Sequence, residues 1–399
     1  MEQLHIFGQP IIDEQSIRQI KRCISSPDDR AALTADAHYG YGHPIGGVLA
    51  YKNKISLSGV GFDIACGNKA CQTNIRAADV DTDKVMDAIF KQIGFGIGRP
   101  NPQPIDHEVF DDISKAEFKP QRDLMGVAMP QLGTVGSGNH FVDLFEDEAG
   151  WLWIGVHFGS RGFGHKTTTG FIAMSQGKGF HDRAHEGSMD APPILFDADS
   201  ALGQDYLEAI RLAGKYAYAG RDTVVDKVLE ILGAQSVFEV HNHHNFLWEE
   251  EHFGETYYVV RKGATPAFPG QMGFVGATMG DTSVIIRGID SPASQEGLYS
   301  TVHGAGRVMS RTQAAGKRRW KQGKIQQLSK GVVDWIKVKK ELKAKGIHLR
   351  GGGADEAPEC YKKLEEVLAF HDGTVEVVHR LRPIGVAMAA ADTYDPYKD

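Results

Sequence analysis

The chain has 399 residues, of which 41% are hydrophobic, enough for a substantial buried core. Its formal net charge of −7 argues against a protein coated by nucleic acid, although a local basic groove is still allowed. No apolar run approaches the ~20 residues that span a bilayer, and the first residues lack a secretory pattern. With four cysteines that form no disulfide framework, these features predict a reduced, cytoplasmic protein without a membrane partner.

Strands and helices alternate irregularly along the first half of the chain. The predicted helices are at 18–23, 83–93 and 205–232, and the predicted strands are at 45–50, 55–57, 69–75 and 151–157. The longest helix has apolar residues at helical spacing and stops at Gly233. The last of these strands ends at His157, which predicts that its imidazole reaches into a cleft.

The second half continues without a regular βαβ rhythm. Residues 237–244 and 256–262 are expected to form a strand pair around a helical or irregular connection. Further elements are expected at 284–287 (strand), 330–345 and 357–370 (helices) and 374–387 (strand). Without repeats or long linkers, this pattern predicts one α+β domain, residues 1–399. Its mixed, mainly antiparallel sheets would be flanked by helices around a central metal cleft.

Residues with metal-ligand chemistry recur in glycine-rich segments between Asp36 and His303. The candidate ligands are Asp63, Cys66, His140, His157 and His244. A set of carboxylate, thiolate and imidazole donors admits Mn²⁺, Zn²⁺ or Fe²⁺. Because the candidates are spread so widely, they suit one site assembled by a large fold better than a local finger.

Two other interpretations compete for these residue types. His181 and His185 stand four apart beside Asp182 and Glu186, but the flanking glycines favour an exposed loop over a helical metal site. Cys66 could instead pair with Cys71 in a disulfide, which a reducing compartment disfavours.

The segment around His303 suggests phosphate chemistry. Residues 159–167 resemble a Walker A loop, but His165 precedes Lys166 and breaks the pattern. Dinucleotide fingerprints and the lysine signature of nucleotidyl transferases are also absent, so a covalent nucleotide intermediate needs another nucleophile. His303, beside glycines, suits that role, and Arg307 and Arg311 would share its face if the segment is helical. His303 as a fourth metal ligand or a cap is the alternative.

A basic cluster lies between Lys317 and Lys345. It contains eleven Lys or Arg residues against Asp334 and Glu341, and it carries Trp320 and Trp335. Such a cluster could hold a nucleic-acid backbone or could be a solvated helix face.

Several long segments resemble the RtcB-type RNA ligases, which use GTP to join a 3′-phosphate or 2′,3′-cyclic-phosphate end to a 5′-hydroxyl end. They occur in the family order over about residues 36–386, at Asp36–Val48, Gly59–Gly67, Gly136–Phe141, His157–His165, His243–Asn245, Arg261–Ala264, His303–Arg311 and Asp355–Glu359.

The resemblance implies a set of roles for matching residues. Two Mn²⁺ ions would be held by Asp63, Cys66, His140, His157 and His244, and His303 would become guanylylated by GTP with Asp36 orienting it. Arg161, Arg307 and Arg311 would hold RNA or triphosphate oxygens. The positions expected around the nucleotide are Asn139, Phe141, Asp143, Asn245, Thr278, Ser283, Gly304, Ala305 and Gly306.

The chain departs from the family pattern in the nucleotide pocket. Residues 276–280 read Gly-Ala-Thr-Met-Gly where the family has Pro-Gly-Ser-Met-Gly, Asp143 replaces a glutamate, and Met388 replaces the lysine on the guanine. Losing that cation should weaken or change base selection. The sequence therefore predicts a ligase for RNA repair or tRNA splicing, as a divergent paralogue. The alternatives are a dinuclear metal phosphoesterase acting on cyclic phosphates and a non-catalytic RNA- or nucleotide-binding regulator. Whether a second protein activates the enzyme is not indicated.

Overall fold

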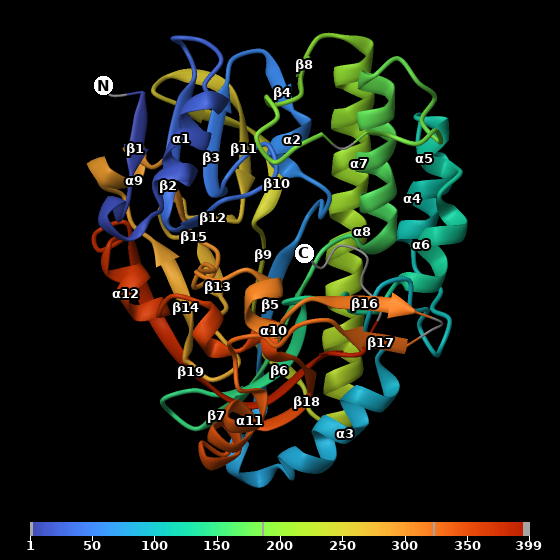
Figure 1. Cartoon of the computed structure of the whole chain (residues 1–399), viewed down its shortest axis with the longest axis vertical. Helices are drawn as coiled ribbons and strands as arrows, with labels where there is room; N and C mark the ends of the chain where they lie inside the picture. The colour runs from blue at the N-terminus through green and yellow to red at the C-terminus, as the bar shows by residue number, and fades with distance from the viewer. Residues whose placement is uncertain (1–2, 186, 322–323, 394–399) are drawn as a thin grey trace.

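The computed structural model describes residues 3–185, 187–321 and 324–393, with backbone alone for 320, 321 and 324. The fold is α+β with mainly antiparallel sheets, which confirms the predicted class. Most strands belong to two sheets, one in the upper and one in the lower part of Figure 1. Among the described residues, no helix is both long and apolar enough to cross a membrane.

The larger sheet has eight strands and is antiparallel except where β18 joins β19. Its strands, in spatial order, are β13 (Met272–Val275), β14 (Ser283–Gly288), β19 (Val375–Ala390), β6 (Phe141–Glu146), β7 (Trp151–Phe158), β5 (Gly67–Arg76) and β9 (Ser236–His243), with β18 (His348–Gly352) beside β19. The backbone N–H of Phe274 in β13 donates to Asn242 in β9, and its carbonyl accepts from Asn68 in β5. These side-chain bonds draw the two edges together, so the sheet curls toward a barrel.

The second sheet has five strands and packs beside the first. Its order is β1 (Leu4–Ile6), β2 (Arg30–His38), β3 (Ile45–Tyr51), β11 (Glu255–Lys262) and β10 (Asn245–His252). Three strand pairs complete the β-structure: β4 (Lys54–Ser56) with β8 (Leu195–Asp197), β12 (Ala264–Pro266) with β15 (Ser300–Val302), and β16 (Arg318–Lys321) with β17 (Lys324–Gln327).

Helices cover the sheets on one side and at the lower end (Figure 1). Beside the long α8 (Ala201–Leu232) lie α7 (Arg161–Ser175), α4 (Val109–Lys115) and α6 (Met125–Gln131). The remaining helices are α1 (Glu14–Cys23), α2 (Leu57–Val60), α3 (Thr82–Gln92), α5 (Lys119–Arg122), α9 (Pro292–Glu296), α10 (Arg311–Ala315), α11 (Trp335–Ala344) and α12 (Leu364–Ala369). Four 3₁₀ turns occur at Gln9–Ile11, Ala77–Asp79, Ala354–Glu356 and Pro358–Cys360. Ser200 caps the start of α8, and Gly233 ends the helix with φ 63°.

Some predicted elements need correction. Residues 237–244 and 256–262 do not pair: β9 pairs with β5, and residues 245–252 form β10, which pairs with β11 in the other sheet. The backbone N–H groups of His244 and Asn245 both donate to the carbonyl of Cys66. This junction turns the chain from one sheet into the other, a long-range contact that local periodicity does not encode.

Two predicted helices are shorter than expected. Within 330–345 the helix begins only at Trp335, because Asp334 accepts hydrogen bonds from the backbone of Ile336 and Lys337 and fixes the start there. Within 357–370 a 3₁₀ turn at Pro358–Cys360 precedes α12. The longest predicted helix and the strands near 45–50, 69–75, 151–157, 284–287 and 374–387 are confirmed with shifted ends.

Candidate active site

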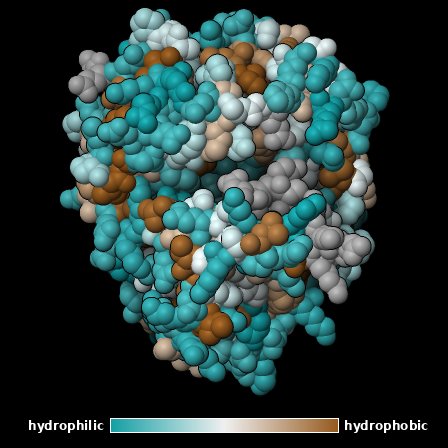
Figure 2. All heavy atoms as spheres, viewed as in Figure 1, coloured by the Kyte–Doolittle hydropathy of each residue, from teal (hydrophilic) through white to brown (hydrophobic). Residues whose placement is uncertain are grey.

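A cavity of about 290 Å³ lies where the two sheets meet. Its lining combines residues from β5, β6, β7 and β19 of the larger sheet with Asn245 of β10 and the turn after β15. Figure 2 shows the molecule hollowed near the centre of the face in view. Segments far apart in the chain therefore converge on one pocket, as the spread of candidate ligands predicted.

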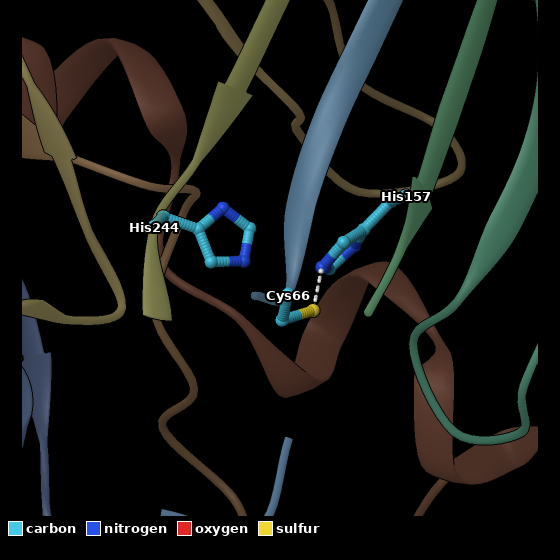
Figure 3. Close-up of side chains that lie close together, drawn as sticks. All are labelled: Cys66, His157 and His244. Atoms are coloured by element: carbon cyan, nitrogen blue, oxygen red, sulfur yellow. Dashed lines mark hydrogen bonds between the residues drawn. The ribbon is translucent and has the colours of Figure 1, made fainter. Parts of the chain in front are cut away.

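Among the described residues, two overlapping groups of potential metal ligands lie at this pocket, and four of their five members line it. Cys66, His157 and His244 form one group, Asp63, Cys66 and His140 the other, and within each the ligand atoms are within 4.8 Å of one another. Figure 3 shows Cys66 and His157 in contact, with the ring of His244 beside them. Cys66 belongs to both groups, so its sulfur is the ligand atom that the two groups share. The five residues are called the ligand cluster below.

The tight turn before β5 brings Asp63 and Cys66 together. The backbone N–H of Cys66 donates to the carbonyl of Asp63 at 3.1 Å, and Ala65 between them has φ 59°. Cys66 Sγ lies 3.2 Å from His157 Nε2 and 3.5 Å from His140 Nε2, which is 3.1 Å from Asp63 Oδ2. These short separations between soft and hard donors suit shared coordination of cations.

Burial sets the charge of the cluster. It lowers the pKa of His157 and His244 well below the usual value, so both imidazoles stay neutral, the form that ligates a metal. Burial raises the pKa of Asp63, but attraction to His140 and hydrogen bonds outweigh it and lower the pKa to about 2. Burial, followed by repulsion from Asp63, raises the pKa of the Cys66 thiol, and a bound dication would reverse that effect. The donor set thus fits divalent metal ions.

Arg221 of α8 braces the cluster from behind. Its fully buried guanidinium donates to the carbonyls of Ala65 at 3.0 Å and Phe158 at 2.6 Å. These residues adjoin Cys66 and His157, so one side chain ties the turn to the end of β7. Arg221 also contacts two histidines that precede His244 on β9. Its Nε lies 2.8 Å from His241 Nε2, and its Nη2 lies 2.9 Å from His243 Nδ1.

His303 lies next to the ligand cluster. It follows β15, and its ring centroid is 5.0 Å from that of His244. Its Nδ1 lies 2.6 Å from Asp36 Oδ2, and Asp36 also accepts from the backbone N–H groups of His303 and Gly304 at 3.0 and 3.3 Å. Thr34 donates to the other carboxylate oxygen at 2.6 Å. Because Asp36 faces Nδ1, the ring's remaining nitrogen, Nε2, is left for a reaction in the pocket.

Burial raises the pKa of Asp36, but the attraction of His303 and the hydrogen bonds outweigh it and lower the pKa to about 2. The carboxylate is therefore charged across the neutral range. It holds the His303 ring in one orientation and would stabilise positive charge that develops on the imidazole.

Comparison with known sequences agrees with this geometry. The family described as tRNA-splicing ligase RtcB matches residues 19–121 and 111–389. The chain belongs to the RtcB family. It is 32% identical to RNA-splicing ligase RtcB1 of Escherichia coli over 391 residues, 88% of each chain. It is 30% identical to the tRNA-splicing ligase RtcB of Archaeoglobus fulgidus over 463 residues, 94% of this chain and 92% of the relative.

The positions that the RtcB resemblance placed around a nucleotide mostly line the pocket. They are Asn139, Phe141, Asp143, Asn245, Thr278, Gly304, Ala305 and Gly306. Ser283 is not among the lining residues. Its hydroxyl accepts a hydrogen bond from the backbone N–H of Ala277 at 2.9 Å.

One side of the pocket is largely apolar, and it contains departures from the RtcB pattern. We call it the apolar wall: Phe141, Asp143, Met279, Val386 and Met388. Phe141 pairs with Met388 and Asp143 with Val386 in the β6–β19 ladder, so all four point to the same face. Burial raises the pKa of Asp143 well above its usual value, and its Oδ1 has no hydrogen-bond partner among the described residues. Asp143 thus contributes to the pocket lining a carboxyl group whose neutral form is favoured by burial.

The three candidate arginines lie in different places, two in the pocket lining and one outside it. The segment from His303 to Ser310 is not helical, so Arg307 and Arg311 do not share a helix face. They line the pocket nonetheless, and both bind the buried Glu356 at 3.0–3.1 Å. Arg161 is not among the lining residues, and it donates to Thr134 at 3.1 Å and to the carbonyl of Gly96 at 2.7 Å.

Several residues of the candidate active site were not predicted from the sequence. Glu356 lies in the segment Asp355–Glu359 that matched the family, and that match was the available signal. Asn68, Tyr361 and Arg221 carried no signal, since each depends on which strand or helix packs there. His181 and His185 are exposed on a loop, and all four cysteines are free, so neither competing interpretation holds.

Proposed function

We propose that this protein is an RNA ligase that joins 3′-phosphate or 2′,3′-cyclic-phosphate ends to 5′-hydroxyl ends, using GTP and two Mn²⁺ ions. One observation carries the proposal: a histidine oriented by a buried carboxylate lies 5.0 Å, ring to ring, from a residue of a two-group ligand cluster. Membership in the RtcB family supports the same reaction class. We also propose that residues 1–399 act as one domain in the cytoplasm.

His303 is the proposed nucleophile. Its Nε2 would attack the α-phosphorus of GTP, forming an N–P bond while pyrophosphate leaves. The guanylyl group would then pass to an oxygen of the RNA 3′-phosphate, which frees His303 and creates a phosphoanhydride. Attack by the 5′-hydroxyl oxygen on the RNA phosphorus would form the new phosphodiester and release GMP. Asp36 supports the first step, because its carboxylate stabilises the positive charge that the ring gains.

Asp63, Cys66, His140, His157 and His244 would hold the cations. Bound there, the cations would neutralise phosphate charge and align attacking and leaving groups. His140 faces Cys66 and Asp63 through its Nε2. The buried Nδ1 of His244 has no hydrogen-bond partner among the described residues, which is consistent with a ring whose bonding is completed by a ligand.

The rest of the pocket would hold the nucleotide and RNA phosphates. Arg307 and Arg311, fixed by Glu356, are the proposed phosphate contacts, while Arg161 supports the loop around Gly96. The backbone of Gly304–Gly306 and the side chains of Asn139, Asn245 and Thr278 complete the lining. With Met388 where the family has lysine, discrimination between guanine and other bases is expected to be weaker.

Incubation with α-labelled GTP and Mn²⁺ tests the proposal. Acid-labile protein label that His303→Ala abolishes, together with joining of 3′-phosphate to 5′-hydroxyl RNA ends, is the expected result. Release of cyclic phosphate without protein label would instead indicate a metal phosphoesterase. RNA or nucleotide binding with neither label nor joining would indicate a regulator. Running the assay with each of the four NTPs measures base preference.

A further inference from the structure

The first part of the basic cluster seen in the sequence forms a hairpin, which follows two arginines of the pocket lining in the chain. From Arg307 to Val333 the chain has eight cationic residues, Arg307, Arg311, Lys317, Arg318, Arg319, Lys321, Lys324 and Lys330, and no Asp or Glu. The first two line the cavity, and α10 then leads to β16 and β17. In a chain with a net charge of −7, this continuous stretch is a strong local exception.

The hairpin has no strand partner beyond itself in the described structure. β16 and β17 form a two-stranded sheet, visible in orange at the right of Figure 1. Arg318 donates to Gln327 at 3.1 Å and to the carbonyl of Ala391 at 3.4 Å, which holds one face against the body. Lys317 and Arg319 lie on the opposite face, since side chains alternate along a strand. Residues 316–321 and 324–333 are called the basic arm below.

The exposed face of the basic arm combines cations with apolar side chains. Lys317, Arg319 and Lys330 are exposed, and no ion pair involves them among the described residues. Leu328 and Val332 are also exposed, at 55% and 65%. Trp335 packs partly buried against the core, so it is not an open stacking surface, and the side chain of Trp320 lies outside the described residues. Unpaired cations beside apolar groups match the backbone and bases of a single strand.

We infer that the basic arm binds the single-stranded RNA that leads to the end being joined, outside the pocket where the reaction occurs. This inference rests on the proposed function and extends it to the substrate several nucleotides from the reacting phosphate. Lys317, Arg319 and Lys330 contact RNA phosphates, and the strand reaches the cavity past Arg311. Charge complementarity and continuity of the chain from the pocket lining to the arm carry the assignment.

The test compares two triple variants of the full chain. The arm variant is Lys317→Gln, Arg319→Gln and Lys330→Gln. The control variant, Lys21→Gln, Lys91→Gln and Arg211→Gln, removes equal charge from exposed positions on α1, α3 and α8 that do not line the pocket. Binding of 3′-phosphorylated RNA is measured by fluorescence anisotropy with Mn²⁺ and without GTP. One RNA is about four nucleotides long and the other about twelve.

The arm variant should bind the longer RNA at least about tenfold more weakly, with its salt-dependence slope reduced by about 2. Its binding of the shorter RNA and its guanylylation of His303 should equal those of the unmodified protein and the control. Equal loss in both triple variants, unchanged binding by the arm variant, or loss of guanylylation in it would each overturn the inference. If the unmodified protein neither guanylylates nor joins RNA, the proposed function fails, and the length dependence of RNA binding still reports on the arm separately.

Discussion

The ligand cluster and the apolar wall belong to one pocket and adjoin where Phe141 and His157 have ring centroids 5.4 Å apart, yet they differ in how strongly their chemistry is constrained. Every residue of the ligand cluster matches the family pattern, and its geometry is fixed by short contacts, by Arg221 and by the turn at Ala65. The apolar wall contains two departures, Asp143 and Met388, and leaves a carboxyl oxygen unpaired. Under the proposed function, reaction chemistry would therefore depend on one part of this site and nucleotide choice on another.

Removing the proposed nucleophile beside the ligand cluster should have the largest effect on activity. His303→Ala is expected to reduce guanylylation by roughly 10⁴-fold or more, because no other described imidazole is paired with Asp36. Protein-bound label from α-labelled GTP measures it. His181→Ala, at an exposed histidine, should label normally. Label that persists in His303→Ala would contradict the assignment of His303 as the nucleophile.

Loss of the shared sulfur should affect both cations. Cys66→Ser is expected to weaken Mn²⁺ binding by at least about a hundredfold and to remove both ions, since Cys66 belongs to both ligand groups. His140→Ala should remove only one, because it contributes to one group. Elemental analysis after dialysis gives the stoichiometry, with Cys71→Ala as the control. Equal stoichiometry in the two cluster variants would contradict the bridging role.

Asp36→Asn tests orientation rather than nucleophilicity. Guanylylation should slow by about a thousandfold while Mn²⁺ binding stays normal, because the amide no longer fixes the ring with its proton on Nδ1. An equal loss of metal binding would show that Asp36 is a structural support for the whole cluster instead.

The lowered pKa of Asp36 also predicts how the free energy of unfolding depends on pH. The folded-state pKa of Asp36 is about 2, below the usual 3.8, so its stabilising contribution is full above the unfolded pKa and is lost as pH falls toward 2. The free energy of unfolding should drop by roughly 2 kcal/mol more in the unmodified protein than in Asp36→Asn between about pH 5 and pH 2. Denaturant titrations at several pH values measure this difference, and parallel curves would contradict it.

Restoring the family's lysine on the apolar wall should have the smallest effect of these changes. It tests whether nucleotide preference can change without a change in metal binding. Met388→Lys places a cation on the same sheet face as Asp143, and should raise preference for GTP over ATP by about tenfold without changing Mn²⁺ binding. Competition between labelled nucleotides gives the ratio. Met129→Lys, at an exposed methionine on α6, is the control. A change in metal binding would show that the two sides are coupled.

Local patterns explain which elements were predictable. The helix ending at Gly233 and the strand ending at His157 carry their own periodicity and stop signals, and both are present. Residues 245–252 were misassigned because their strand identity depends on pairing with β11 and on the backbone contact with Cys66, not on an internal pattern. A shared helix face for Arg307 and Arg311 was conditional on a helical segment, which the structure does not have; Glu356 from a distant segment holds both side chains instead.

The sequence alone determined the chemical inventory: a thiol, a carboxylate and imidazoles able to ligate metal, a histidine among glycines, and the loss of a lysine at position 388. Donor chemistry belongs to each side chain and does not need the fold. Only the tertiary structure decided that Asp36 faces His303, that Cys66 is shared by two ligand groups, and that Arg221 supports them. These relations join residues separated by tens to hundreds of positions, and such contacts are set by how the sheets pack, which no short stretch of sequence specifies.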